Sequence, residues 1–173
     1  SEFEAGLEIV SIQAPLEQIA NETAHFGFFN ALPDPDGPLR QLPLLFRHKD
    51  RLYPSLALKA AALYFDYEIH PLAGQLRANT FSAIEFGGDL PVPTNENAIQ
   101  LINYYKDPAI YFPTFSLADI IDGTVAPTTY EGKIIMVGAT ALGLFDLRPN
   151  PFNPTTPGVY IHAMSIQNML DGI

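Results

Sequence analysis

Prolines and glycines interrupt this chain so often that only short helices and strands can form between them. Sixteen prolines and twelve glycines among 173 residues place one of the two about every six positions. Proline lacks the backbone N–H that helices and sheets use, and glycine favours the backbone conformations of turns. We therefore expect many short elements rather than a few long ones. The chain contains no internal repeat.

Two segments have the sequence pattern of longer helices. Pro54 opens the first, Ser55–Phe65, because proline is tolerated in the first turn of a helix. Its only charged residue is Lys59, so we expect this helix to be buried on several sides. In the second, from about Val159 to Leu170, apolar residues recur at spacings of four, three and four, which places them on one helical face.

Shorter elements are predicted around these helices. A short helix is expected at Leu16–Glu22. Another is expected to start at Ser116–Asp119, which fits a capping box, and to end at Asp122-Gly123. The segment Pro33–Pro38 is predicted to be a turn, and Lys49–Arg51 the tip of a hairpin. The predicted strands are His25–Asn30, Leu39–His48, Thr80–Phe86, Ile99–Tyr105 and Ile134–Val137.

The run Ile134–Val137 is the clearest of these strands. Successive apolar residues that end at Gly138 are typical of a central strand covered on both faces. Strands that alternate with helices indicate an α/β fold, a mixed β-sheet with helices packed against it. Because 47% of the residues are hydrophobic, the chain can bury a core, and we expect residues 1–173 to form a single domain. The first forty residues offer no strong strand–helix–strand unit, so we expect N-terminal elements to be missing.

Charge and composition exclude several classes of protein. The formal net charge is −10, which argues against a nucleic-acid partner because phosphate binding needs clustered Lys and Arg. The absence of cysteine excludes disulfides, thiolate metal sites and cysteine nucleophiles, and it leaves the cellular compartment open. No apolar run approaches the roughly 20 residues needed to span a bilayer.

Known binding motifs occur only in incomplete form. Gly138–Gly143 has the glycine spacing of a phosphate-binding loop, but Leu144 and Phe145 stand where a Walker loop needs Lys and Ser or Thr. Exposed N–H groups of this loop could still hold a small anion. Asp34 and Asp36 resemble the start of a calcium loop, which two prolines interrupt, so we interpret them as turn residues.

Catalytic and metal signatures are also absent from the sequence. The histidines His25, His48, His70 and His162 are too far apart for a local zinc motif, and Gly-x-Ser-x-Gly does not occur. We therefore expect no catalytic residue, no metal and no cofactor. His162 is interpreted as a hydrogen-bonded core residue rather than a ligand. Tyrosines near apolar segments, among them Tyr104, suit the edge of a core or a ligand pocket.

Short motifs along most of Phe26–Leu170 occur in a specific order, although each alone is weak. They are Pro35-Asp36-Gly37 with Arg40 and Pro43-Leu44-Leu45, Tyr53–Leu58, Leu101–Tyr105, Phe112-Pro113-Thr114 with Ser116 and Asp119, Gly132-Lys133-Ile134, Val137–Ala141, Gly143-Leu144 with Asp146, and Pro157-Gly158-Val159 with His162-Ala163. This succession resembles the type 2 CHASE domains (cyclase/histidine-kinase-associated sensory extracellular domains).

The chain departs from the family pattern in two places. Tyr160 stands one residue after Gly158-Val159, where members of the family usually carry Glu. Members also usually begin with a strand and a helix that include a Trp-Pro element, before the turn at Asp36-Gly37. This chain has no Trp and little room for that stretch, so we expect it to be N-terminally truncated or an unusual member.

The resemblance implies an extracytoplasmic sensory domain, periplasmic or on the cell surface, of a bacterial membrane receptor with no catalytic site of its own. The output domain would be a histidine kinase, an adenylate or diguanylate cyclase, or a Ser/Thr kinase. The expected partners are an unidentified small molecule or other extracellular signal, the receptor's own membrane helices and output domain, and a second copy in a homodimer.

Two other functions stay open. One is a dimerisation or protein-interaction module without a ligand, and the more remote one is an α/β hydrolase-like enzyme. Arg40 and Asp146, which are charges in apolar or turn segments, could form a structural ion pair instead of a site. The residues that we expect first to bind a ligand or to signal are Asp36, Arg40, Tyr104, Thr140, Asp146 and His162.

Overall fold

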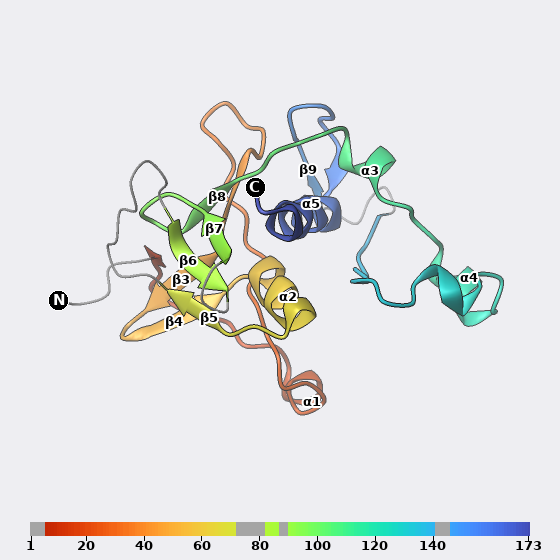
Figure 1. Cartoon of the computed structure of the whole chain (residues 1–173), viewed down its shortest axis with the longest axis horizontal. Helices are drawn as coiled ribbons and strands as arrows, with labels where there is room; N and C mark the ends of the chain where they lie inside the picture. The colour runs from red at the N-terminus through yellow and green to blue at the C-terminus, as the bar shows by residue number, and fades with distance from the viewer. Residues whose placement is uncertain (1–5, 72–81, 87–89, 141–145) are drawn as a thin grey trace.

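The computed structural model describes residues 6–71, 82–86, 90–140 and 146–173 (Figure 1). Over these residues the protein has the α/β fold that the sequence predicts. The helices are α1 (Glu17–Ala20), α2 (Leu56–Phe65), α3 (Pro108–Tyr111), α4 (Leu117–Ile121) and α5 (Gly158–Asp171), with a 3₁₀ turn at Pro127–Thr129. The strands are β1 (Leu7–Glu8), β2 (Gln41–Pro43), β3 (Leu45–His48), β4 (Arg51–Pro54), β5 (Ile69–Pro71), β6 (Ser82–Phe86), β7 (Leu90–Pro93), β8 (Ile99–Leu101), β9 (Leu147–Arg148) and β10 (Thr156–Pro157).

The strands of the described ranges form four small sheets. One is mixed, because β1 pairs in parallel with β3, which in turn pairs antiparallel with β4. The other sheets are antiparallel and consist of β2 with β8, β9 with β10, and β5-β6-β7. A mixed sheet is thus present as predicted, but the strands are divided among several small sheets.

The predicted turns and short helices are present. In the turn Pro33–Pro38, the N–H of Gly37 donates to the C=O of Asp34 at 2.8 Å, and β3 and β4 form a hairpin with Lys49 and Asp50 at its tip. Helix α1 lies within Leu16–Glu22, and α4 ends before Gly123. Ser116 caps α4 by accepting from the N–H of Ala118, but among the described hydrogen bonds the Asp119 carboxylate accepts none from the N–H of Ser116.

Helix α2 begins after Pro54, with Ser55 as its N-cap. The Ser55 Oγ accepts a hydrogen bond from the N–H of Leu58 at 3.1 Å, which satisfies one of the free donors in the first turn. The buried residues of α2 lie on a single face; they are Ala57, Leu58, Ala61 and Ala62. Because Leu63 and Tyr64 are 47% and 52% exposed, the prediction that this helix is buried on several sides is wrong.

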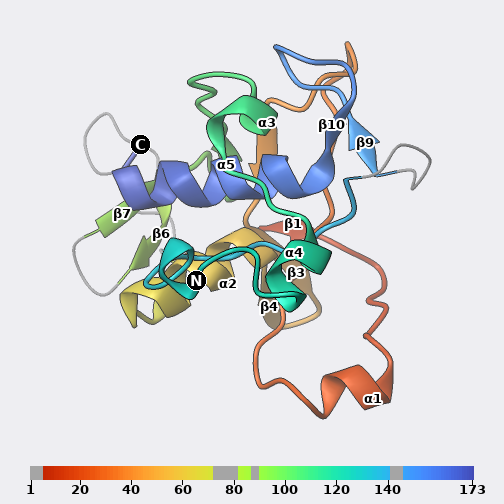
Figure 2. The same ribbon diagram turned by 90° about the vertical axis from the view of Figure 1, so that its right-hand side faces the viewer.

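Core residues pack against α5 along most of its length. Ile166 and Met169 pack into a cluster with α2 and the neighbouring sheets, whereas Ile161 and Met164 pack into a second cluster that includes Leu42 of β2. Figure 2 shows α5 crossing the middle of the molecule, with α2 below it and α3 above it. The predicted helix Val159–Leu170 is therefore confirmed, and it joins the two parts of the core.

Buried polar side chains fasten α5 to β8. Ser165 donates to the side chain of Gln100, and both side chains are buried. The fully buried Asn168 accepts from the N–H of Asn103 at 2.8 Å and donates to the C=O of Asn103 at 3.1 Å. These backbone groups are no longer available to a neighbouring strand, so β8 ends at Leu101 and the predicted strand Ile99–Tyr105 is too long.

Two other predicted strands differ from the structure. The predicted strand Leu39–His48 is divided into β2 and β3 at Leu44, whose N–H donates to Ala98 O while its C=O accepts from Ser55 N. Pro43 has no N–H to continue one ladder across this point. The segment His25–Asn30 makes a single bridge, between Phe28 and Ser55, and is otherwise irregular.

The prediction of a central strand at Ile134–Val137 is wrong. Within the described part of the chain these residues pair with no strand. Ile134 and Met136 pack against the core cluster, whereas Ile135 and Val137 are 54% and 78% exposed. In the described ranges the segment is therefore covered on one side, that of Ile134 and Met136, and largely exposed on the other.

Candidate functional site

A cavity of about 360 Å³ lies at the N-terminal end of α5. Its lining combines an apolar wall with a few polar groups. The lining residues are Phe29, Asn30, Ala31, Leu39, Leu56, Met136, Val137, Gly138, Asp146, Arg148, Gly158, Val159, Ile161 and His162. A second hollow of about 370 Å³ at the β3–β4 hairpin is lined by His48–Arg51 and Tyr53, none of them buried, so we assign no site there.

Close backbone packing places Phe29 at the wall of the cavity. The N–H of Phe28 donates to Pro54 O, and the C=O of Phe28 accepts from Leu56 N at 2.7 Å. Gly27 makes this approach possible, since a Cβ atom there would lie 2.5 Å from the backbone N of Leu56. The segment is thus held against the start of α2, and the carbonyl group of Phe29 reaches α5.

His162 is the buried polar residue of this cavity. It is 8% exposed, and its Nε2 lies 3.1 Å from the carbonyl oxygen of Phe29. Because a carbonyl oxygen can only accept, Nε2 carries the hydrogen and Nδ1 of the neutral ring is a hydrogen-bond acceptor. Among the described residues Nδ1 has no partner. His162 is therefore the hydrogen-bonded core histidine that the sequence suggested, with one ring nitrogen unsatisfied.

Burial lowers the pKa of His162, and this effect outweighs the Phe29 hydrogen bond and the nearby Asp146 charge, which both act in the opposite direction. The neutral ring is consequently favoured in the folded protein. The unpaired Nδ1 is itself shielded from solvent, so the cavity does not expose this acceptor.

This pKa shift predicts a pH dependence of stability. Below the ordinary histidine value of 6.5 the unfolded chain binds a proton at position 162 that the folded chain excludes, so the free energy of unfolding should fall. It should change little from this group above about pH 7.5. Urea unfolding at pH 5.5 and 7.5 measures the difference, which His162→Gln is expected to reduce. The matched variant of an exposed histidine, His25→Gln, should keep it, and an undiminished difference in His162→Gln would contradict this assignment.

Asp146 forms the polar edge of the cavity beside α5. Its carboxylate lies so close to Gly158 that a Cβ atom at Gly158 would be 2.8 Å from both oxygens, and its C=O accepts from Gly158 N. Arg148, on β9, approaches the carboxylate at 3.7 Å, and both side chains are about half exposed. Such an exposed, loose ion pair contributes little to stability and is easily rearranged.

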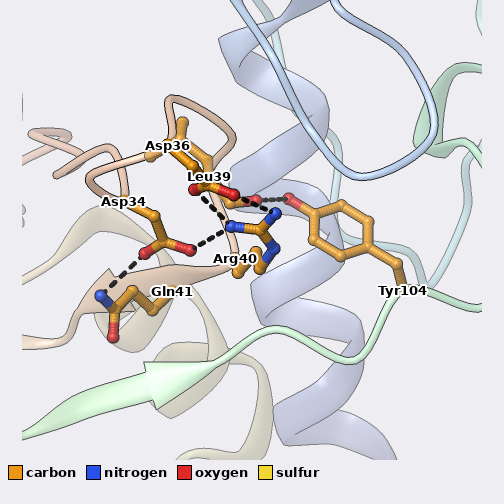
Figure 3. A network of polar contacts seen from close by, with 6 residues as sticks. All are labelled: Asp34, Asp36, Leu39, Arg40, Gln41 and Tyr104. Carbon is orange, nitrogen blue, oxygen red and sulfur yellow. Dashed lines mark hydrogen bonds and ion pairs between the residues drawn. The ribbon is translucent and has the colours of Figure 1, made fainter.

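The turn Pro33–Pro38 carries a separate polar network (Figure 3). The Arg40 guanidinium donates to both oxygens of Asp36 at 2.7 and 2.8 Å, and to Asp34 at 2.8 Å. Gln41 also donates to Asp34, and the Tyr104 hydroxyl donates to the C=O of Leu39. The network joins the turn to β2 and to the segment after β8.

In this network the positive charge of Arg40 is paired with the negative charges of Asp34 and Asp36. Hydrogen bonds from Arg40 hold the pKa of Asp36 below its usual value, and bonds to both carboxylates raise the pKa of Arg40. Burial, with a smaller contribution from the Asp34 charge, raises the pKa of Tyr104, so its hydroxyl stays protonated. The carboxylates of Asp34 and Asp36 therefore already compensate the Arg40 charge. We interpret the cluster as a structural ion network that stabilises the turn.

The structure divides the six residues singled out from the sequence into three sets. Asp36, Arg40 and Tyr104 come together at the turn, Asp146 and His162 at the cavity, and Thr140 is exposed and belongs to neither. The suggested ion pair between Arg40 and Asp146 is wrong, because Arg40 bonds to Asp34 and Asp36 and Asp146 lies beside Arg148. A role for any of these residues in binding stays a prediction.

Sequence reasoning missed part of the cavity. The carbonyl group of Phe29 and the guanidinium of Arg148 come from irregular or very short elements, where no periodicity marks a residue as facing a site. The proposed anion loop lies only partly within the described residues, which exclude 141–145. No group of His, Asp or Glu that could hold a metal ion occurs in the described ranges.

The comparison with protein families gives one clear finding. The model of the CHASE2 domain matches residues 4–173, and no curated protein or solved structure matches the chain. CHASE2 domains are extracellular sensory domains of receptors. In the described part of this chain no helix has the length and apolar character that crossing a membrane requires.

Proposed function

Since this chain belongs to the CHASE2 family of sensory domains, we propose that it is the ligand-binding, extracytoplasmic part of a bacterial transmembrane receptor. The output domain would be a histidine kinase, an adenylate or diguanylate cyclase, or a Ser/Thr kinase. The domain itself would bind and signal without catalysing a reaction.

One observation carries this proposal: a cavity of about 360 Å³ at the start of α5 has an apolar wall beside the polar side chains of Asp146, Arg148 and the buried His162. Ligand pockets in proteins combine an apolar lining with a few polar groups that fix orientation, and their volumes are about 300–1,000 Å³. This cavity has both properties.

The position of the cavity suggests how binding is transmitted. Gly158 and His162 at the start of α5 line it, and the helix is continuous over its 14 residues from Gly158 to Asp171. Asn168 holds the far half of α5 to the residues after β8. A ligand shifts the receptor only by binding two arrangements unequally, and a displacement of α5 would carry that difference toward the membrane helices.

A second function is favoured by exposed apolar side chains on and near α3 and α4. Ile110 and Ile121 are 78% and 75% exposed, and α4 has no buried residue. Figure 1 shows α4 at the edge of the molecule, away from α2 and α5. Large exposed apolar groups often mark protein contacts, so a dimerisation or protein-interaction module is the alternative function.

Thermal-shift screening of the domain against a metabolite library tests the proposal. A ligand present at 100 times its Kd stabilises the folded state by about 2.7 kcal/mol, which for a domain of this size raises Tm by roughly 5–10 °C. Val137→Trp, a change at an exposed cavity residue, should abolish that shift because the indole fills the cavity.

The matched control is Ile121→Trp, which adds the same side chain at an equally exposed position on α4, outside the cavity lining. This variant should retain the ligand-induced shift. If no compound of a broad library raises Tm and the domain instead dimerises with increasing concentration, the ligand-binding proposal fails in favour of the interaction module.

A further inference from the structure

The segment that follows Lys133 has the burial pattern of a β-strand, although within the described ranges it pairs with no strand. Ile134 and Met136 pack on the core, whereas Ile135 and Val137 are 54% and 78% exposed. Side chains of an extended chain point to opposite sides in turn, so this alternation is that of a strand. The segment therefore lies on its own core with an apolar outer face.

Gly138 fixes the end of this segment against α5. A Cβ atom at Gly138 would lie 2.6 Å from the Cβ of Val159, so only glycine permits the approach. Gly138 faces inward like Met136 two positions before it, and the alternation thus continues to the end of the apolar run. Contacts within the domain therefore hold the segment in place, and its outer face exists before any partner binds.

The backbone of the segment offers hydrogen-bonding groups along its whole length. Among the described residues, no hydrogen bond uses an N–H or a C=O group of residues 134–140. A row of such groups beside apolar side chains is the edge to which a further β-strand adds. A small molecule can pair with one or two of these groups, whereas a second strand pairs with all those that point toward it. The occupant that fits is therefore an extended apolar peptide segment.

Charge indicates a second copy of the chain as the source of that segment. The formal net charge of −10 makes two copies repel each other over most of their surfaces. Residues 134–145 include no charged side chain, so two copies can approach there without placing like charges together. A second copy also brings an apolar strand whose own backbone groups are unpaired.

From this arrangement we propose that two copies of the domain associate by antiparallel pairing of residues 134–138 across a twofold axis at Met136. An axis perpendicular to the paired strands keeps both outer faces on the same side, so Ile135 of one copy lies opposite Val137 of the other. The two resulting pairs join the exposed side chains into one apolar surface. This inference goes beyond the proposed function and holds with or without a ligand.

Analytical ultracentrifugation of the domain from micromolar to millimolar concentration tests the association. The contact is smaller than the about 800 Å² per partner that stable complexes bury, so we expect a weak, reversible dimer. Ile135→Lys places a charge in the outer face and should raise the dissociation constant at least tenfold. Ile121→Lys, the same change at an exposed position on α4, should leave the dissociation constant unchanged. Circular dichroism verifies that both variants fold.

The absence of cysteine from the chain makes the register itself testable. A mixture of the Ile135→Cys and Val137→Cys variants should form a disulfide-linked dimer on oxidation, because directly opposite residues have Cα atoms about 4.5–5.5 Å apart. Either variant alone should crosslink much less. Its two cysteines are diagonal neighbours about 7–8 Å apart, which exceeds the usual span of a disulfide.

Each other outcome overturns the proposal. A domain that stays monomeric at millimolar concentration would leave the edge to a strand of another protein. A dimer that persists in Ile135→Lys or dissociates in Ile121→Lys, or equal crosslinking in all three cysteine samples, would place the contact elsewhere. Ile135 is not among the lining residues of the cavity, so a ligand-induced rise in Tm should survive in Ile135→Lys. The ligand-binding function and the dimer can therefore fail independently.

Discussion

Replacement of Leu58 by alanine is expected to lower the free energy of unfolding by about 2–5 kcal/mol. Leu58 is completely buried in α2 and packs in the cluster that joins this helix to α5 and the neighbouring sheets. Removing three carbon atoms from such a site loses apolar burial and leaves a cavity that the surrounding side chains only partly fill. Urea unfolding followed by circular dichroism measures the loss, which corresponds to a decrease in Tm of roughly 4–20 °C for a domain of this size.

Leu63→Ala is the matched control on the same helix. Leu63 is 47% exposed, so the same chemical change removes side-chain atoms that already contact water. We expect its effect to remain below about 1 kcal/mol. If both variants lose the same free energy, α2 is buried on more faces than one and the orientation described here is wrong.

The second large effect is expected from Asn168→Ala, which should lower the free energy of unfolding by about 2–3 kcal/mol. The buried Asn168 side chain makes hydrogen bonds to both the N–H and the C=O of Asn103. Its removal leaves these backbone groups without a protein partner and opens a void between α5 and the segment after β8. Because the contact holds the C-terminal half of α5, amide exchange at Ile166 and Met169 should also accelerate.

Its control is the neighbouring Gln167→Ala. Among the described residues Gln167 donates to Asp171, on the exposed side of the same helix, so its replacement should change stability by less than about 0.5 kcal/mol. A similar loss in both variants would indicate that helix propensity, rather than the bonds to Asn103, governs the stability of α5.

The longer helices could be predicted from sequence because local signals agree there. Proline, a capping serine and an apolar run define α2, and apolar periodicity defines α5. The degree of burial could not be predicted, since it depends on what packs around each helix. Ile134–Val137 has the pattern of a central strand, yet a run of this kind can be apolar whether neighbouring elements cover both of its faces or only one.

Single residues of the candidate site could be predicted from the sequence, but their arrangement around one cavity could not. Asp146 and His162 were singled out as charged or polar residues in apolar surroundings, but nothing in their spacing of 16 positions indicated that they share a cavity. Phe29 is 133 positions from His162 and contributes a backbone carbonyl, a group that every residue carries. Contacts of this kind arise from the fold and leave no motif in the sequence.

A crystal structure of the domain with a stabilising compound shows whether a small molecule binds at the start of α5. We expect electron density for the compound inside the cavity, in contact with the lining residues Asp146, Arg148 or His162. A compound bound elsewhere, for example on the exposed side chains of α4, with the cavity empty, would overturn the assignment of the cavity as the binding site.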